Sequence, residues 1–305
     1  MTSSERVVHG ADLPVDPLWP RAGNWPEPSG HSRFALIGVP TWRTSISATN
    51  AGQTPDAVRA MIPRYSMFSH AAAAHPGARA VTFADYGNVP DPDADEQGAI
   101  AAIAAVDAEL LVALGGDNAA TVPTALGRWG DRLATAGLVT VDAHYDLRDG
   151  VSNGSPVRRL IEAGLDGRRV VQVGISDFAN SAEYAARARD LGIAVVLRDE
   201  LLKRPMADVM AEAFEIAGSA GGPIHVDLDV DVCDRSVAPA CPASVPGGIA
   251  AQELRAAARA AGLDGRVESI DLVEVDATAD TPDARTVRLV ALCVLEAAAG
   301  LALRS

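Results

Sequence analysis

The sequence predicts an α/β fold of three layers, αβα, with a mostly parallel central sheet covered by helices on both faces. Short apolar runs recur along the chain and alternate with amphipathic segments rich in Ala and Arg. The runs lack a polar face, which is typical of parallel strands buried between two helical layers. No linker or composition break divides the chain after residue 33. We therefore expect a single α/β domain over residues 34–305.

Each expected element follows from this alternation. Residues 1–33 are rich in Pro, Ser and Gly and lack periodicity, which predicts an N-terminal arm that Trp19 and Trp25 attach to the body or to a neighbouring subunit. The expected strands are the apolar runs at 34–40, 80–85, 110–116, 137–144, 169–176, 193–197, 223–230 and 269–276. The expected helices lie near 55–63, 95–107, 118–129, 181–191, 205–218, 250–262 and 284–301.

Composition excludes several classes of function. The 305 residues carry 40 acidic and 26 basic side chains, a net charge of −14, and both nucleic acid and anionic membranes need clustered Lys and Arg. Three cysteines (Cys233, Cys241 and Cys293) are too few and too irregularly spaced for a disulfide framework. The first residues lack the pattern of a signal peptide, and no apolar run reaches the roughly 18 residues of a membrane span. We expect a cytoplasmic protein.

Polar residues close several apolar runs, where an open parallel sheet binds its ligand. Asp142, His144 and Asp146 occupy alternate positions at the end of one run. Three Asp at 227, 229 and 231 do the same at another. Alternate residues of a strand point to one face, so each triplet directs its polar groups together.

A buried carboxylate is costly unless a positive group neutralises it. Neither triplet contains Lys or Arg, so a multivalent cation is the expected partner. Carboxylates with one imidazole suit Mn²⁺, and less specifically Fe, Ni, Co or Zn. The supply of acids exceeds the need of one ion, which favours two metals. A lone D-x-D is more often a loop cap, and the GGDN turn at 115–118 alone is equally weak. The combination predicts a metal site.

At these residues the sequence resembles the ureohydrolase superfamily of arginases, agmatinases and formimidoylglutamases. GGDN is similar to the family's GGDH turn, and DAHYD (142–146) to its D-A-H-x-D motif. DLDVDVCDRSVAPACPASVPGG (227–248) resembles its S-x-D-x-D-x-x-D segment, and DLVEVD (271–276) its D-x-x-E segment. The resemblance runs from about residue 34 to 301. It implies the arginase-like fold and hydrolysis of a C–N bond in a guanidinium or amidine.

The resemblance also implies roles for individual residues. Asp142 and Asp229 would bridge two Mn²⁺ ions, and Asp146 would accept a hydrogen bond from the attacking hydroxide and help to move its proton. Glu274 would hold the cationic amidine group of the substrate. The implied ligands of the two ions are Asn118, Asp142, His144, Asp146, Asp229 and Asp231.

Two positions depart from the family pattern. Asn118 stands where the family has His, and an amide oxygen is a weaker ligand than imidazole, so we expect one metal to bind less tightly or not at all. Asn153 begins the segment NGSP, where agmatinases have a His-Gly-Thr-Pro-like segment. The His that donates a proton in guanidine-cleaving enzymes is therefore missing.

The segment from 142 to 192 resembles the formimidoylglutamase branch, which releases formamide from N-formimidoyl-L-glutamate in histidine degradation. That substrate carries two carboxylates, so an Arg near the cleft is expected: Arg148, Arg158 and Arg159 are candidates. Other implied substrate contacts are Asn153, Ser155, Asn180 and Glu274.

Two alternatives stay open. One is an agmatinase or guanidino-acid hydrolase that releases urea and tolerates Asn153. The other is a metal-depleted, non-catalytic ureohydrolase homologue, which Asn118 motivates. The resemblance further implies a homo-oligomer, a trimer or a hexamer.

Overall fold

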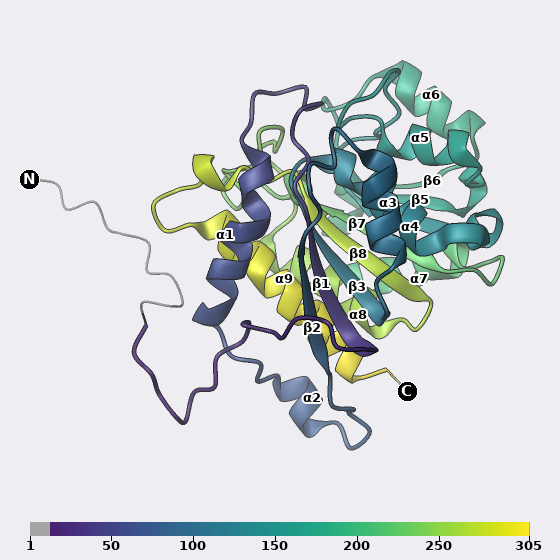
Figure 1. Ribbon diagram of the computed structural model, residues 1–305. Coiled ribbons are helices and arrows are strands. Elements are labelled where there is room, and N and C mark those ends of the chain that lie inside the picture. Colours follow the sequence, from purple (N-terminus) through teal and green to yellow (C-terminus); the bar gives the residue numbers. More distant parts are fainter. Residues whose placement is uncertain (1–12, 305) are drawn as a thin grey trace, which may run out of the picture.

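One eight-stranded sheet forms the centre of the protein in the computed structural model, which describes residues 13–304 (Figure 1). The strand order is β2-β1-β3-β8-β7-β4-β5-β6, and every pair of neighbours is parallel. The predicted fold class is thereby confirmed. The strands are β1 (Ser32–Val39), β2 (Phe83–Asn88), β3 (Ala108–Gly115), β4 (Gly137–Val141), β5 (Val170–Ile175), β6 (Ala194–Leu197), β7 (Ile224–Asp229) and β8 (Val267–Val273).

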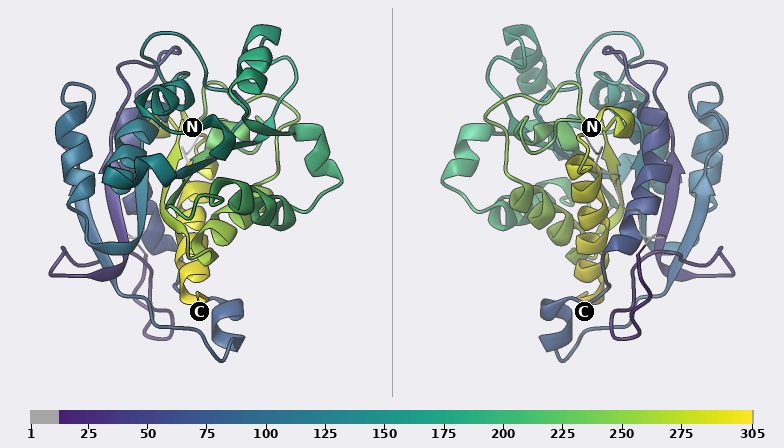
Figure 2. Two further views of the ribbon diagram at one scale, coloured as in Figure 1. Left: turned by 90° about the vertical axis from the view of Figure 1, so that its right-hand side faces the viewer. Right: turned by 90° about the vertical axis from the view of Figure 1, so that its left-hand side faces the viewer.

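Helices cover both faces of the sheet (Figures 1 and 2). One face packs its apolar side chains against four helices: α1 (Thr54–Met61), α7 (Met206–Ala217), α8 (Ala251–Leu263) and α9 (Arg285–Ala302). The other face packs against α3 (Glu96–Ala104), α4 (Thr121–Trp129), α5 (Pro156–Ala163) and α6 (Ala182–Asp190). Burial on both faces explains why most of the strands carry no polar face.

Each predicted strand and each predicted helix has a counterpart in the structure. Two short helices were not expected: α2 (His70–Ala74) and α5. Pro156 occupies the start of α5, where its missing N–H has no helical partner to lose, and Val157 and Leu160 are buried on its inner face. No helix within residues 13–304 combines the length and hydropathy needed to cross a membrane.

The N-terminal arm contacts the body through Trp25. Its ring stacks on Phe83 with centroids 4.7 Å apart, and its edge meets Phe34. Trp19 is half exposed. Residues 1–12 lie outside the described part of the chain, and the division into an arm and one domain stays a prediction.

The carboxyl ends of the four central strands converge on one edge of the sheet. These strands are β3, β8, β7 and β4, in that order. The connections that leave the neighbouring strands β4 and β7 lead to opposite sides, to β5 and to β8. Such a switch point leaves a crevice at the carboxyl ends of parallel strands. The backbone at Gly116, just after β3, passes so close to Thr41 that an added Cβ would lie 1.9 Å from its carbonyl oxygen. A side chain is therefore excluded at this edge of the crevice.

Candidate metal centre

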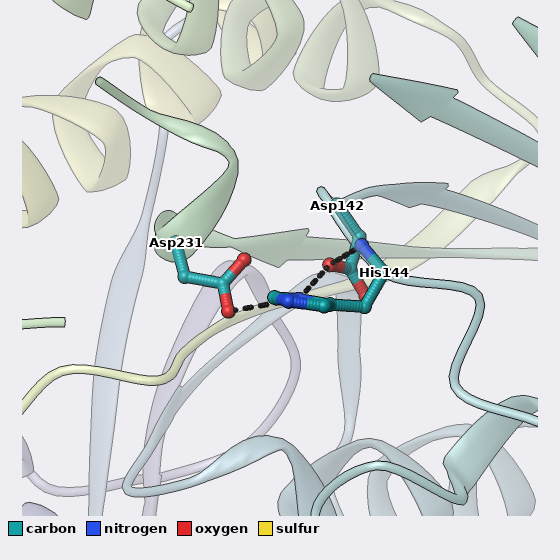
Figure 3. Close-up of side chains that lie close together, drawn as sticks. All are labelled: Asp142, His144 and Asp231. Carbon is teal, nitrogen blue, oxygen red and sulfur yellow. Dashed lines mark hydrogen bonds and ion pairs between the residues drawn. The ribbon is translucent and has the colours of Figure 1, made fainter. Parts of the chain in front are cut away.

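A cluster of two carboxylates and one imidazole lies at this edge (Figure 3). Asp142 and His144 follow β4, and Asp231 lies in the turn after β7. Their ligand atoms lie within 4.8 Å of one another. The Nδ1 atom of His144 lies 3.1 Å from Oδ2 of Asp231 and 3.4 Å from Oδ1 of Asp142. The structure thus brings together residues from both predicted triplets.

Buried oxygen atoms without partners show that this cluster suits a cation. Oδ2 of Asp142 and Oδ1 of Asp231 are buried and accept no hydrogen bond from any described residue. Burial raises the pKa of Asp142 to about 6, against the opposing effect of His144. Burial lowers the pKa of His144, but Asp231 and Asp142 outweigh it and raise that pKa to about 12. Hard oxygen atoms with one imidazole form a donor set that Mn²⁺ accepts.

Two further acids and an amide extend the cluster. The Nδ2 atom of Asn118 donates to Oδ2 of Asp146 over 2.7 Å and to Oδ2 of Asp229 over 3.1 Å. Burial raises the pKa of both carboxyl groups well above the ordinary range. Thr121 donates its hydroxyl hydrogen to Oδ1 of Asn118. The amide nitrogen therefore faces the carboxylates, and the oxygen faces Thr121.

Glu274 lies beside this group, directly after β8. Its Oε1 atom accepts the backbone N–H of Asn118 over 2.8 Å and the Nδ2 hydrogen of Asn153 over 2.7 Å. Burial is the main reason that the pKa of Glu274 is raised to about 8, and Asp117 and Asp231 add to it.

Two residues of the site have left-handed backbone conformations. The φ angle is 52° at Asp146 and 63° at Glu274. Such a conformation costs a non-glycine residue about 1–3 kcal/mol and persists only where the surroundings enforce it. Packing and hydrogen bonds therefore hold both carboxylates at the cluster.

A cavity of about 380 Å³ opens over the cluster. A larger groove of about 650 Å³ lies between α2 and α9, and no predicted site residue lines it. The smaller cavity is the one that predicted site residues line. Its polar lining includes His144, Asp146, Arg148, Asn153, Asn180, Asp229, Asp231 and Glu274.

The candidate arginines have different surroundings. Arg148 lines the cavity and is exposed, and among the described residues its side chain has no hydrogen bond or ion pair. Arg158 bonds the carbonyls of Arg148 and Gly150 and pairs with Glu162. Arg159 forms an ion pair with Glu96, with an N–O distance of 2.7 Å. Only Arg148, of the three, presents an unpaired cation to the cavity.

Ser155 and Asn180 stabilise the loops around the cavity. Ser155 is fully buried, does not line the cavity and donates its hydroxyl hydrogen to the carbonyl of Ser152 over 2.7 Å. Asn180 lines the cavity, but its amide nitrogen donates to the carbonyls of Ala143 and Ser176, and its oxygen accepts the N–H of Tyr145. Asn180 therefore uses its amide nitrogen and oxygen to connect two loops, and these are the same groups that would bind a substrate.

Several residues of the cavity wall were not predicted. Ile46, Tyr145 and Phe178 line it. Phe178 is fully exposed, with a φ angle of 64°. These residues come from separate loops, and no spacing in the sequence indicates that the loops meet.

A second polar group lies deeper, below the cluster. His225 is fully buried and contacts Oγ of Ser269 over 2.8 Å and Oδ2 of Asp271 over 3.2 Å. Asp227 is paired in register with Asp271, and burial together with that neighbour raises its pKa well above the ordinary range. Among the described residues, neither His225 nor Asp227 forms a hydrogen bond or ion pair with the cluster, so we do not count them as ligands.

Comparison with known proteins identifies the family of the chain. The profile of the arginase family matches residues 32–300. A formimidoylglutamase of Halalkalibacterium halodurans is 33% identical over 260 residues, 81% of each chain. The formimidoylglutamase of Bacillus subtilis is 30% identical over 88% of this chain and 87% of its own length. Guanidinopropionase of Pseudomonas aeruginosa is 36% identical, but over 57% of this chain.

Solved structures give the same result. The crystal structure of the Bacillus subtilis formimidoylglutamase superposes with a TM-score of 0.81 at 29% identity and covers 98% of this chain and 93% of that one. A Trypanosoma cruzi formiminoglutamase determined with Mn²⁺ superposes with a TM-score of 0.79 at 23% identity over 90% of this chain and 95% of that one, which shows a shared fold.

Proposed function

The chain belongs to the arginase family, and from this premise we propose that it is a metal-dependent formimidoylglutamase. It hydrolyses the C–N bond of N-formimidoyl-L-glutamate and yields L-glutamate and formamide, a step of histidine degradation. One observation carries the choice of substrate: the cavity has buried carboxylates at its floor and the unpaired Arg148 on its wall. This arrangement suits a molecule with a cationic amidine at one end and carboxylates at the other.

Two Mn²⁺ ions per chain form part of the proposal. The bound ions would lower the pKa of water and supply a nucleophile near neutral pH. Asn118 can become a ligand if its amide turns by half a rotation, because the hydroxyl of Thr121 can then accept from the nitrogen instead of donating to the oxygen. We expect that ion to be held less tightly. The proposed ligands are Asn118, Asp142, His144, Asp146, Asp229 and Asp231.

The side chains around the cavity bind the substrate, accept a proton and support the loops. Glu274 holds the amidinium by a charge-assisted hydrogen bond and so orients the carbon to be attacked. Asp146 receives the proton of the attacking water, because it lies at the cluster with its carboxylate against Asn118. Arg148 binds a carboxylate of the glutamyl end, and Asn153 and Asn180 keep the walls in position. Ser155 and Arg158 contribute by stabilising the loop that carries Arg148.

The experiment that tests this proposal compares two substrates. The Mn²⁺-loaded protein is incubated with N-formimidoyl-L-glutamate and, separately, with agmatine, and formamide and urea are measured. We expect formamide from the first and little urea from the second. Urea release without formamide would establish the guanidino-hydrolase alternative. Absence of both products, from protein that binds fewer than two Mn²⁺ per chain, would instead favour the metal-depleted, non-catalytic alternative.

The proposal includes the cell compartment and the assembly. The resemblance to ureohydrolases supports a cytoplasmic homo-oligomer, a trimer or a hexamer. Gel filtration with light scattering measures the mass in solution, and a mass near the 31.5 kDa of one chain would contradict the assembly.

A further inference from the structure

Asn153 connects Glu274 to a distant loop. Its Nδ2 atom donates to Oε1 of Glu274 over 2.7 Å, and its Oδ1 atom accepts the backbone N–H of Ile46 over 3.0 Å. A backbone N–H can only donate, so the contact with Ile46 fixes which end of the Asn153 amide faces Glu274. The amide therefore presents a hydrogen-bond donor to the carboxylate of Glu274.

The two oxygens of Glu274 are consequently unequal. Oε1 already accepts two hydrogen bonds, from Asn153 and from the backbone of Asn118, which fills the acceptor sites that one carboxylate oxygen offers. Oε2 accepts a hydrogen bond from none of the described residues, and Glu274 lines the cavity. Only one oxygen of Glu274 remains for a ligand.

A formimidoyl group and a guanidino group differ by one nitrogen. The formimidoyl carbon carries hydrogen where the guanidino carbon carries NH₂, so a guanidinium brings two more N–H donors into the site. Oε1 of Glu274 is filled, Oδ1 of Asn153 is directed at the N–H of Ile46, and the nitrogen of Asn153 is itself a donor. A buried donor left without an acceptor loses affinity by about tenfold or more.

We propose that Asn153 is a specificity-determining residue that makes the site accept amidines and reject guanidines. It does so by filling Oε1 of Glu274 and by presenting a donor where a third nitrogen would need an acceptor. The inference rests on the proposed function, since it assumes that Glu274 binds the amidine end. Asn153 would thus select the substrate actively, in addition to lacking the proton-donating His of guanidine-cleaving enzymes.

The test uses the full-length, Mn²⁺-loaded protein and two substrates that differ only in that nitrogen, N-formimidoyl-L-glutamate and N-carbamimidoyl-L-glutamate. The measured quantity is the kcat/KM for N-formimidoyl-L-glutamate divided by the kcat/KM for N-carbamimidoyl-L-glutamate. Asn153→Asp is the informative variant because it keeps the shape of the side chain and the acceptor for Ile46 but replaces the donor by an acceptor. We expect the ratio to fall by about tenfold or more. A ratio within twofold of that of the unaltered protein overturns the inference.

Two controls separate selectivity from general damage. Arg148→Ala should lower kcat/KM for both substrates and leave their ratio unchanged, because both carry the same glutamyl end. Asn153→Ala removes the contact with Ile46 as well, so comparison with Asn153→Asp distinguishes loss of the loop contact from the change of donor to acceptor. Thermal unfolding establishes that each variant is folded.

A binding measurement keeps the inference testable if turnover fails. Should the unaltered protein release no formamide, the proposed function is wrong, but calorimetric titration with both compounds still compares their affinities. We expect Asn153→Asp to bind N-carbamimidoyl-L-glutamate more tightly, relative to the formimidoyl compound, than the unaltered protein does. Equal relative affinities would overturn the role of Asn153 independently of catalysis.

Discussion

The side-chain nitrogen of Asn118 lies 2.7 Å from Oδ2 of Asp146 and donates a hydrogen bond to it. An amide at this position can face the carboxylates with either end, whereas only its oxygen can bind a metal. In the proposed site, where Asn118 is a ligand, metal binding replaces the hydrogen bond from Asn118 to Asp146 by a bond from the amide oxygen to the ion. This exchange is the physical reason to expect one weaker metal site.

Asn118→His should tighten binding of the weaker ion. An imidazole binds Mn²⁺ without first giving up a hydrogen bond to Asp146, so we expect an affinity gain of about tenfold, or about 1.4 kcal/mol. Calorimetric titration of the metal-free protein with Mn²⁺ measures the affinity of both sites. Unchanged affinity at both would mean that residue 118 is not a ligand.

Asp142→Ala should remove most of the metal and the activity. Asp142 is fully buried within the cluster and contacts His144, and its proposed role is to bridge both ions. We expect fewer than one Mn²⁺ per chain by elemental analysis and a kcat lower by ~1,000-fold or more, equivalent to about 4 kcal/mol. Asp131→Ala, at an exposed Asp, is the matched control. Two bound ions in Asp142→Ala would contradict the ligand assignment.

Metal affinity should increase with pH. In the metal-free protein the pKa of His144 is about 12, so the imidazole carries a proton at neutral pH. The pKa of Asp142 is about 6, so that carboxyl group is half protonated near pH 6 and mostly ionised at pH 8. Protons compete with the metal for these atoms, and raising the pH removes them.

The measurement is Mn²⁺ binding at pH 6 and pH 8, with protons counted from calorimetry in buffers of different ionisation enthalpy. We expect proton release at both pH values and tighter binding at pH 8. Equal affinity at the two pH values, without proton release, would show that His144 and Asp142 are not ligands.

Arg148→Ala should weaken use of the acidic substrate specifically. Loss of a charge-assisted hydrogen bond lowers kcat/KM for N-formimidoyl-L-glutamate by roughly tenfold, and Arg148→Lys should restore part of it. A formamidine without carboxylates, such as N-ethylformamidine, serves as the control substrate. An equal loss with both substrates would indicate that Arg148 supports the loop and does not bind the carboxylates.

Local patterns explain why most of the fold was predictable. Most strands are short apolar runs, as at β3 and β4, because both faces of the sheet are buried there. Helix α5 was missed because its first residues were interpreted as part of a motif, although Pro156 followed by Val157 and Leu160 is typical of a helix start with one buried face.

The site was predictable only where its residues are close in sequence. Asp142 and His144 alternate along the chain, and Asp231 belongs to a similar triplet, so their spacing indicated a shared direction. The bond between Asn153 and Glu274 joins residues 121 positions apart, and its geometry depends on the left-handed conformation of Glu274 and on the contact of Asn153 with Ile46. Such long-range contacts leave no periodic trace in one sequence.

The most direct test of the central claim is a titration of chelator-treated protein with Mn²⁺, in which formamide release from N-formimidoyl-L-glutamate is followed at each addition. The account predicts no activity without metal and a rise to a plateau at two equivalents per chain. The second equivalent should bind less tightly than the first. Full activity of the metal-free protein, or no formamide release after two equivalents of Mn²⁺ have been added, would contradict it.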